Sequence, residues 1–187
     1  MVNSPDRSAG VKQSVRDQAF TLFARRGYSA TGVRDIAAAA GVDPAIVIRH
    51  FGSKEALFLQ TMSMPAAWSE AIEGPISEVG RRMAEIVVRS QSAGLRIYAA
   101  LMRASDRPEI AARLKQPMTE AWTKPLVSRL GGADAEIRAH FFAAQLQGLM
   151  DALALREDEF LVNMPPEELV ARYGHILQDT LTGDRFH

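Results

Sequence analysis

The sequence predicts an all-α protein in which a small three-helix unit at the amino terminus precedes a larger helical domain. Apolar residues recur at the three- to four-residue spacing of helices along the whole chain, and no run of alternating apolar and polar residues marks a strand. Two very short helical segments follow one another between residues 33 and 50. With 187 residues, 47% of them hydrophobic, the chain can bury a core as one domain or as a small domain joined to a larger one.

The first element is a helix expected over residues 11–26. Gly27 follows it and supplies the left-handed residue that often ends a helix. One face of the helix carries the apolar residues Val15, Ala19, Leu22 and Phe23. Residues 1–10 combine Pro, Ser, Asp and Gly without an apolar segment, so we expect a flexible tail there.

Two short helices are expected next, at residues 33–40 and 44–50. The first has small and branched apolar residues on its inner side, namely Val33, Ile36, Ala37 and Ala40. Gly41 lets the chain reverse where a residue with a Cβ would be strained. Asp43 is a good N-cap and Pro44 a good first helical residue, so the second short helix begins where the turn ends.

The remaining chain contains about five further helices of ordinary length. Ser53 offers its hydroxyl to cap a longer helix that begins at Lys54. Pro117 and Pro125 fall inside what otherwise reads as one long helix, so we expect kinks or interruptions there. Breaks between helices are expected at Met64-Pro65, Gly74-Pro75, Ala93-Gly94, Arg107-Pro108, Gly131-Gly132 and Pro165-Pro166.

Charge and composition exclude several functions. The net charge is zero, yet residues 1–60 hold eight basic and five acidic residues, a net of +3, which leaves −3 for the rest. The absence of cysteine excludes disulfides, thiolate metal sites and cysteine nucleophiles. No secretory signal or membrane-spanning stretch is present, so a cytoplasmic location is expected.

Motifs of catalysis are missing too. The sequence has no glycine-rich phosphate loop, no Gly-x-Ser-x-Gly and no His-Glu-x-x-His, so it predicts neither an enzyme nor a cofactor. His175 and Asp179 stand four residues apart on a helix, but a metal site needs a third ligand, and we predict no bound metal.

The two short helices have the geometry of a helix-turn-helix. On the second one Val47 and Phe51 point inward, whereas Ala45 and Arg49 face away. Such a helix enters the DNA major groove, where short Ala45 admits the backbone and Ile46 or Ile48 can touch a thymine methyl group. A plain helical hairpin inside a bundle has the same connection length and remains the alternative from geometry.

Residues 19–58, "AFTLFARRGYSATGVRDIAAAAGVDPAIVIRHFGSKEALF", resemble the tetracycline-repressor (TetR) family of bacterial transcriptional regulators. The shared pattern is Phe, Gly-Tyr, Thr, Val-Arg-x-Ile-Ala, Ala-Gly-Val, Pro and His-Phe-x-x-Lys-Glu-x-Leu, in order and without gaps. The resemblance implies an all-helical homodimer with an amino-terminal DNA-binding domain. It also implies a carboxy-terminal domain that binds a small effector and then releases operator DNA.

The resemblance also assigns roles to single residues. Phosphate contacts are implied at Thr31, Arg34, His50 and Lys54, and contacts to bases or backbone at Ala45, Ile46 and Arg49. Ile48 stands where the family often has a tyrosine that reaches the DNA backbone, and Gly32 where a hydroxyl residue is common. Both departures weaken the expected phosphate contacts. The implied organisation is a tail (1–10), a helix-turn-helix domain (11–52) and an effector-binding and dimerisation domain (53–187).

The segment from Asp134 to Leu155 is apolar on two opposite sides. One stripe contains Ile137, Phe141, Ala144, Gly148 and Leu155. The other contains Phe142, Leu146, Leu149 and Leu153. A helix with two apolar sides needs two partners, and we predict a second copy of the chain on one of them. The candidate interface is the latter stripe together with Tyr173 of the helix over 166–181, although the sequence does not decide which stripe faces the second copy. A fully buried central helix in a monomer is the alternative.

An apolar effector pocket is expected between the middle helices. Its predicted lining is Met83, Tyr98, Met102 and Trp122, with Gln145 as a polar anchor, and Met62, Trp68 and Met118 lie in the same region. Ordinary core packing explains the same residue types. The predicted function is therefore a ligand-responsive DNA-binding regulator, most simply a repressor of a near-palindromic operator. The alternative is a helical small-molecule-binding or interaction module that no longer binds DNA.

Overall fold

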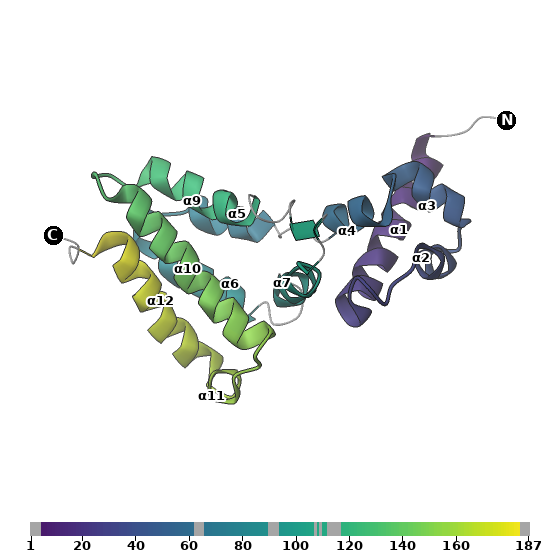
Figure 1. Ribbon diagram of the computed structural model, residues 1–187. Coiled ribbons are helices and arrows are strands. Elements are labelled where there is room, and N and C mark those ends of the chain that lie inside the picture. The colour runs from purple at the N-terminus through teal and green to yellow at the C-terminus, as the bar shows by residue number, and fades with distance from the viewer. Residues whose placement is uncertain are drawn as a thin grey trace. The chain divides into compact units, whose positions relative to one another are not determined.

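The computed structural model describes the backbone of residues 5–61, 66–89, 94–106, 108, 110–111 and 117–183 (Figure 1). Helices dominate these ranges and no strand occurs in them, which confirms the all-α prediction. None of the helices in these ranges is long and apolar enough to cross a bilayer. Backbone contacts divide the chain into two compact units, one within 1–63 and 100–112 and the other within 64–99 and 113–187.

The first unit contains α1 (Pro5–Arg26), α2 (Val33–Ala40), α3 (Pro44–Phe51) and α4 (Lys54–Thr61). Helix α2 has the predicted bounds and α3 is one residue longer than predicted. Helix α1 begins six residues earlier than expected, so residues 5–10 are helical instead of forming a tail. Proline fits the first turn of a helix, because its missing N–H would have no intrahelical acceptor there.

An aromatic cluster holds α1 and α4 together. The Phe58 ring meets Phe23 edge-on at a centroid distance of 5.0 Å and Tyr28 at 5.0 Å. Leu57 is also fully buried. Ser53 caps α4 as predicted, because its hydroxyl accepts a hydrogen bond from the Ala56 N–H. The core of this unit therefore includes α4 and extends beyond the boundary expected after residue 52.

The second unit contains most of the remaining elements. These are α5 (Ala66–Glu73), η1 (Ile76–Glu78), α6 (Val79–Arg89), α9 (Pro117–Arg129), α10 (Ala135–Ala154), α11 (Glu159–Val162) and α12 (Pro166–Thr182). Helix α7 (Gly94–Arg103) begins in this unit, and its residues from Ala100 onward belong to the first.

Three of the six predicted breaks between helices lie within the described residues. The structure confirms these breaks, at Gly74-Pro75, Gly131-Gly132 and Pro165-Pro166. The other three breaks include residues 64–65, 93 and 107, which lie outside the described residues. Helix α9 is described from Pro117 onward, residues 112–116 before it lie outside the described ranges, and Pro125 lies inside the helix.

Helices α6 and α12 cross with their backbones in contact. A Cβ on Gly80 would lie 2.4 Å from the Gln178 backbone nitrogen, and one on Gly174 would lie 2.9 Å from the Cα of Arg81. The Gln178 side chain joins the same crossing, because its Oε1 accepts from the Gly80 N–H at 2.9 Å and its Nε2 donates to the Ile76 carbonyl at 3.0 Å. The side of α12 that carries Gly174 and Gln178 therefore packs against α6 within the unit.

Candidate nucleic-acid interface and carboxy-terminal domain

Backbone capping positions α2 and α3 on either side of a tight turn. Gly41 adopts a left-handed conformation with φ of 67°, and the Val42 N–H returns to the Ala37 carbonyl at 3.0 Å. The Asp43 carboxylate accepts a hydrogen bond from the Ala45 N–H at 2.8 Å, which caps α3. These local signals make a helix-turn-helix whose second member begins at Pro44.

Helix α3 has one buried and one exposed face, as the sequence predicted. Val47 and Phe51 are buried in the core of the unit. Ala45 and Arg49 are exposed, and Ile48 has 44% of its surface exposed. Ile46 and His50 lie at the edge of this face and are half-buried. The exposed face of α3 therefore combines small and apolar side chains with the cation of Arg49. Such a face can contact thymine methyl groups and nearby phosphates.

Thr31 does not lie where a phosphate could reach it, which corrects the expectation for this residue. Its side chain is completely buried. The hydroxyl donates toward the Gly27 carbonyl at 2.9 Å and lies 3.3 Å from the Leu22 carbonyl. Thr31 thus satisfies carbonyls at the carboxyl end of α1, which would otherwise lack donors. Arg34, by contrast, is exposed on α2.

Lys54 lies against an aromatic ring at the beginning of α4. Its Nζ is 4.1 Å from the centroid of Tyr28, within the range of a cation–π interaction. The Tyr28 hydroxyl donates to Glu55, and this hydrogen bond is the main reason why the pKa of Glu55 is lowered. The ring therefore holds the Lys54 side chain in a half-buried position beside α4.

Three carboxylates near α2, α3 and α4 accept local hydrogen bonds. Asp43 caps α3, Glu55 accepts from Tyr28, and Asp35 accepts from the Gly32 N–H at 2.8 Å. In the described part of this unit neither Arg34 nor Arg49 forms an ion pair. Their charges therefore remain available to the phosphates of a nucleic acid.

The carboxy-terminal helix α10 corrects the predicted dimer interface. Phe142, Leu146 and Leu149 are buried within a single chain, and so is Leu153, because this stripe faces the unit's own core. They cannot also cover a second copy. The opposite stripe is open: Ile137 is 53% exposed and Phe141 47%.

Helix α12 packs against α10 and also carries an exposed apolar residue. Tyr173 is half-buried, and its hydroxyl donates to the Gln145 carbonyl at 3.0 Å, which ties α12 to α10. Burial raises the pKa of Tyr173. Ile176, three residues further along α12, is 47% exposed.

Most of the predicted effector residues take part in core packing or in contacts between helices. Met83, Tyr98 and Trp122 are buried core residues of the second unit. Met102 belongs to the first unit. Gln145 accepts a hydrogen bond from the Thr180 hydroxyl at 2.9 Å and so serves the α10–α12 contact. Met62 lies outside the described residues, as does the side chain of Met118.

Two polar groups in this core were missed by sequence reasoning. The Tyr98 hydroxyl donates to Asp151 on α10, with an oxygen–oxygen distance of 2.5 Å. Trp68 stacks on Trp122 at 5.8 Å, and within the described residues its buried indole N–H has no acceptor. Asp151 interrupts the apolar run of α10, which is the sequence signal that could have revealed the first of them.

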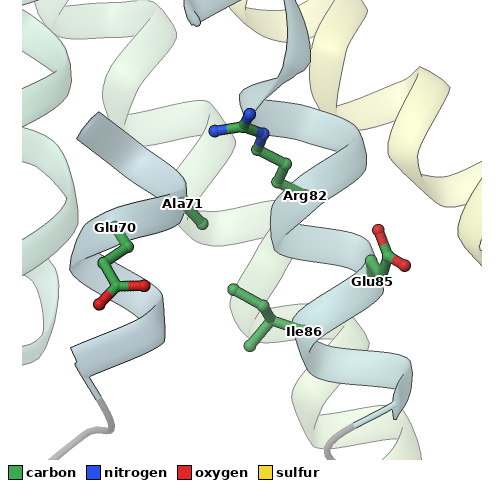
Figure 2. A pocket seen from close by; sticks show the side chains of 5 residues that line it. All are labelled: Glu70, Ala71, Arg82, Glu85 and Ile86. Carbon is green, nitrogen blue, oxygen red and sulfur yellow. The ribbon is translucent and has the colours of Figure 1, made fainter. Parts of the chain in front are cut away.

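Figure 2 shows an open groove of about 270 Å³ between α5 and α6. Its lining is Glu70, Ala71, Arg82, Glu85 and Ile86. Ile86 points into the space between the two helices, and the Arg82 guanidinium lies at one end of it. A second groove, of about 600 Å³, borders α11 and includes Phe160, which is 75% exposed. Neither groove contains a predicted effector residue.

His175 and Asp179 face each other on α12, with 3.6 Å between Nδ1 and Oδ1. Among the residues that the structure describes, no three His, Asp or Glu side chains gather around a common point that could hold a metal ion.

Comparison with known proteins matches both parts of the chain. Residues 15–61 match the family model for bacterial regulatory proteins of the tetR family, and residues 77–181 match the tetracyclin repressor-like C-terminal domain. The HTH-type transcriptional repressor KstR2 of Rhodococcus jostii is 49% identical over 49 residues, which are 26% of this chain and 24% of that protein. The match thus spans about a quarter of the curated relatives' length.

Solved structures resemble almost the whole chain. A TetR-family regulator from Streptomyces coelicolor A3 is 28% identical, with a TM-score of 0.60 over 97% of this chain and 99% of that one. NalD, the secondary repressor of the MexAB-OprM multidrug efflux pump in Pseudomonas aeruginosa, has a TM-score of 0.74 over 95% and 99% at 20% identity. The carboxy-terminal family model alone covers more than half of the sequence. The chain therefore belongs to the TetR family of transcriptional regulators.

Proposed function

We propose that this protein is a ligand-responsive transcriptional repressor that binds a near-palindromic DNA operator as a homodimer. The α3 helices of the two copies enter two successive major grooves, one helix in each, about 34 to 36 Å apart. A small molecule bound in the carboxy-terminal domain releases the DNA. Family membership supports the regulator class, and the relatives KstR2 and NalD are named as repressors.

The surface of α3 is the observation that carries the DNA-binding part. Its outer face presents Ala45, Ile48 and Arg49, while Val47 and Phe51 anchor the helix from below. An isoleucine that is nearly half exposed gains by contact with a thymine methyl group, and Arg34 supplies charge for the backbone. The roles of Ala45, Ile46, Arg49 and His50 remain predictions of this proposal.

Variants of the two helices separate base reading from phosphate binding. Ala45→Ser or Ile46→Val is expected to change which operator sequence is preferred, because both side chains lie on or beside the outer face of α3. Arg34→Gln is expected to weaken binding to all sequences alike and to reduce its salt dependence. Arg172→Gln, an exposed arginine of α12, is the matched control and should leave DNA binding unchanged. Equal losses in Arg34→Gln and Arg172→Gln would contradict the assignment.

A second copy of the chain is proposed to cover the open stripe of α10 and the neighbouring face of α12. Ile137, Phe141 and Ile176 are 53%, 47% and 47% exposed, and a twofold interface would remove this apolar surface from water. Sedimentation at micromolar concentration and physiological salt tests this assignment. A compact monomer would contradict it.

The effector is proposed to be a small, largely apolar molecule that binds in the carboxy-terminal domain. The stacked Trp68 and Trp122 and the polar Tyr98–Asp151 pair provide flat apolar surface and hydrogen-bonding groups in that unit. Both tryptophans of the chain take part, so their emission reports directly on this region. A compound that displaces bound DNA should also change the tryptophan emission. Displacement without an emission change would place the effector elsewhere.

A further inference from the structure

Two cations of α1 lie over the last residue of α3. The Lys12 Nζ is 5.8 Å and the Arg16 Cζ 5.9 Å from the centroid of the Phe51 ring. Lys12 and Arg16 are four residues apart, so they project from the same face of α1. Figure 1 shows the amino-terminal part of α1 beside α3 within this unit. The His50 ring lies next to the same phenylalanine, at a centroid distance of 6.4 Å.

Neither cation is neutralised in the described part of the chain. Lys12 and Arg16 form no ion pair there, although Asp17 is close in sequence. The Asp17 carboxylate instead accepts a hydrogen bond from Gln13 at 2.9 Å. The Arg16 Nε is buried and has no acceptor within the described residues. Because a phosphate outside the protein cannot reach this Nε, the terminal nitrogens of Arg16 and the ammonium of Lys12 are the groups that could bind one.

The location gives these charges a function beyond packing. Both side chains are half-buried, with their stems against the protein, so less conformational entropy is lost when their charged groups bind an anion. They stand at the carboxyl end of α3, the helix that presents the DNA-reading face. A duplex whose major groove holds α3 brings its backbone past both ends of that helix.

We propose that Lys12 and Arg16 bind backbone phosphates flanking the groove occupied by α3, which makes α1 part of the DNA surface. The inference rests on the proposed DNA-binding function and adds two residues to it. Cation–π contact with Phe51 and the negative end of the α3 dipole also favour cations at this place. If Lys12 and Arg16 only stabilised the fold through Phe51, removing their charges would lower stability and leave the salt dependence of DNA binding unchanged.

The test measures the salt dependence of binding to the duplex that the wild-type protein selects from a random pool. Lys12→Met and Arg16→Met keep most of each apolar stem and remove the charge, whereas Lys12→Arg and Arg16→Lys keep the charge. Arg26→Met removes an exposed charge at the other end of the same helix and is the matched control. Thermal melting and sedimentation confirm that each variant is folded and has the wild-type oligomeric state.

Each lost phosphate contact lowers the slope of log K against log salt by about 0.9, hence by about 1.8 in a dimer. We expect this reduction in Lys12→Met and in Arg16→Met, and wild-type slopes in Lys12→Arg, Arg16→Lys and Arg26→Met. Unchanged slopes in both methionine variants, or an equal reduction in Arg26→Met, would overturn the inference and leave the DNA-binding function intact. If the wild-type protein selects no duplex, both the function and the inference fail.

Discussion

Tyr98 on α7 donates its hydroxyl to the carboxylate of Asp151 on α10, in the core of the carboxy-terminal unit. Tyr98 itself is fully buried, and Asp151 is half-buried. Burial, followed by the hydrogen bond to Asp151, raises the pKa of Tyr98. The pair therefore links two helices through one charge-assisted hydrogen bond in surroundings that are mostly apolar.

Tyr98→Phe is expected to lower the free energy of unfolding by about 1 to 3 kcal/mol, because it leaves the Asp151 carboxylate without this donor. Tyr173→Phe is the control, since the Tyr173 hydroxyl donates to a neutral carbonyl near the surface and should cost less. Urea denaturation of both variants checks the order. A loss in Tyr98→Phe no larger than in Tyr173→Phe would show that the pair contributes little.

The same pair predicts a loss of stability in alkaline solution. Unfolded tyrosine releases its proton near pH 10, whereas folded Tyr98 keeps its proton to higher pH. Above about pH 10 the unfolded state therefore binds fewer protons, and the free energy of unfolding falls as the pH rises. Tyr98→Phe should flatten this decline. Parallel curves for wild type and variant between pH 9 and pH 11 would contradict the assignment.

Phe58→Ala is expected to destabilise the amino-terminal unit by about 3 to 5 kcal/mol, because the buried ring packs edge-on against both Phe23 and Tyr28. Leu59→Ala, at a half-buried neighbouring position, should cost less. Denaturant unfolding of the whole chain measures both. If Phe58→Ala leaves the transition unchanged, α4 is not part of this core.

Phe141→Glu is expected to produce a folded monomer, because the charge falls on the exposed stripe of α10 and disfavours contact with a second copy. Leu146→Glu on the buried stripe should instead unfold the carboxy-terminal unit, since it places a charge in the core. Sedimentation and circular dichroism distinguish the two results. A dimer that survives Phe141→Glu would contradict the proposed interface.

The helix-turn-helix could be predicted from the sequence, because the residues that specify it are close together in the chain. Gly41, Asp43 and Pro44 specify the turn, the cap and the first helical residue within a stretch of four residues, and the structure uses each in that way. The amino end of α1 was missed. Proline and aspartate at positions 5 and 6 favour a helix start, but the Arg, Ser, Ala and Gly that follow carry little of the apolar periodicity by which helices are recognised.

Features that depend on tertiary packing could not be predicted from one sequence. Both stripes of α10 are apolar, and only its packing against α9 and α12 leaves Phe142 inside and Phe141 outside. Thr31 matches a family position at a phosphate, yet its hydroxyl turns to the end of α1 because the carbonyls there need a donor.

Selection of duplexes from a random pool by the full-length wild-type protein tests the central claim most directly. Selection at low salt, followed by a salt titration on the enriched sequence, measures specific binding and the phosphate contribution together. The account predicts an enriched inverted repeat whose half-site centres lie about one helical turn, or a multiple of it, apart. A folded dimer that enriches no sequence at low salt would contradict it and favour a small-molecule-binding module without DNA binding.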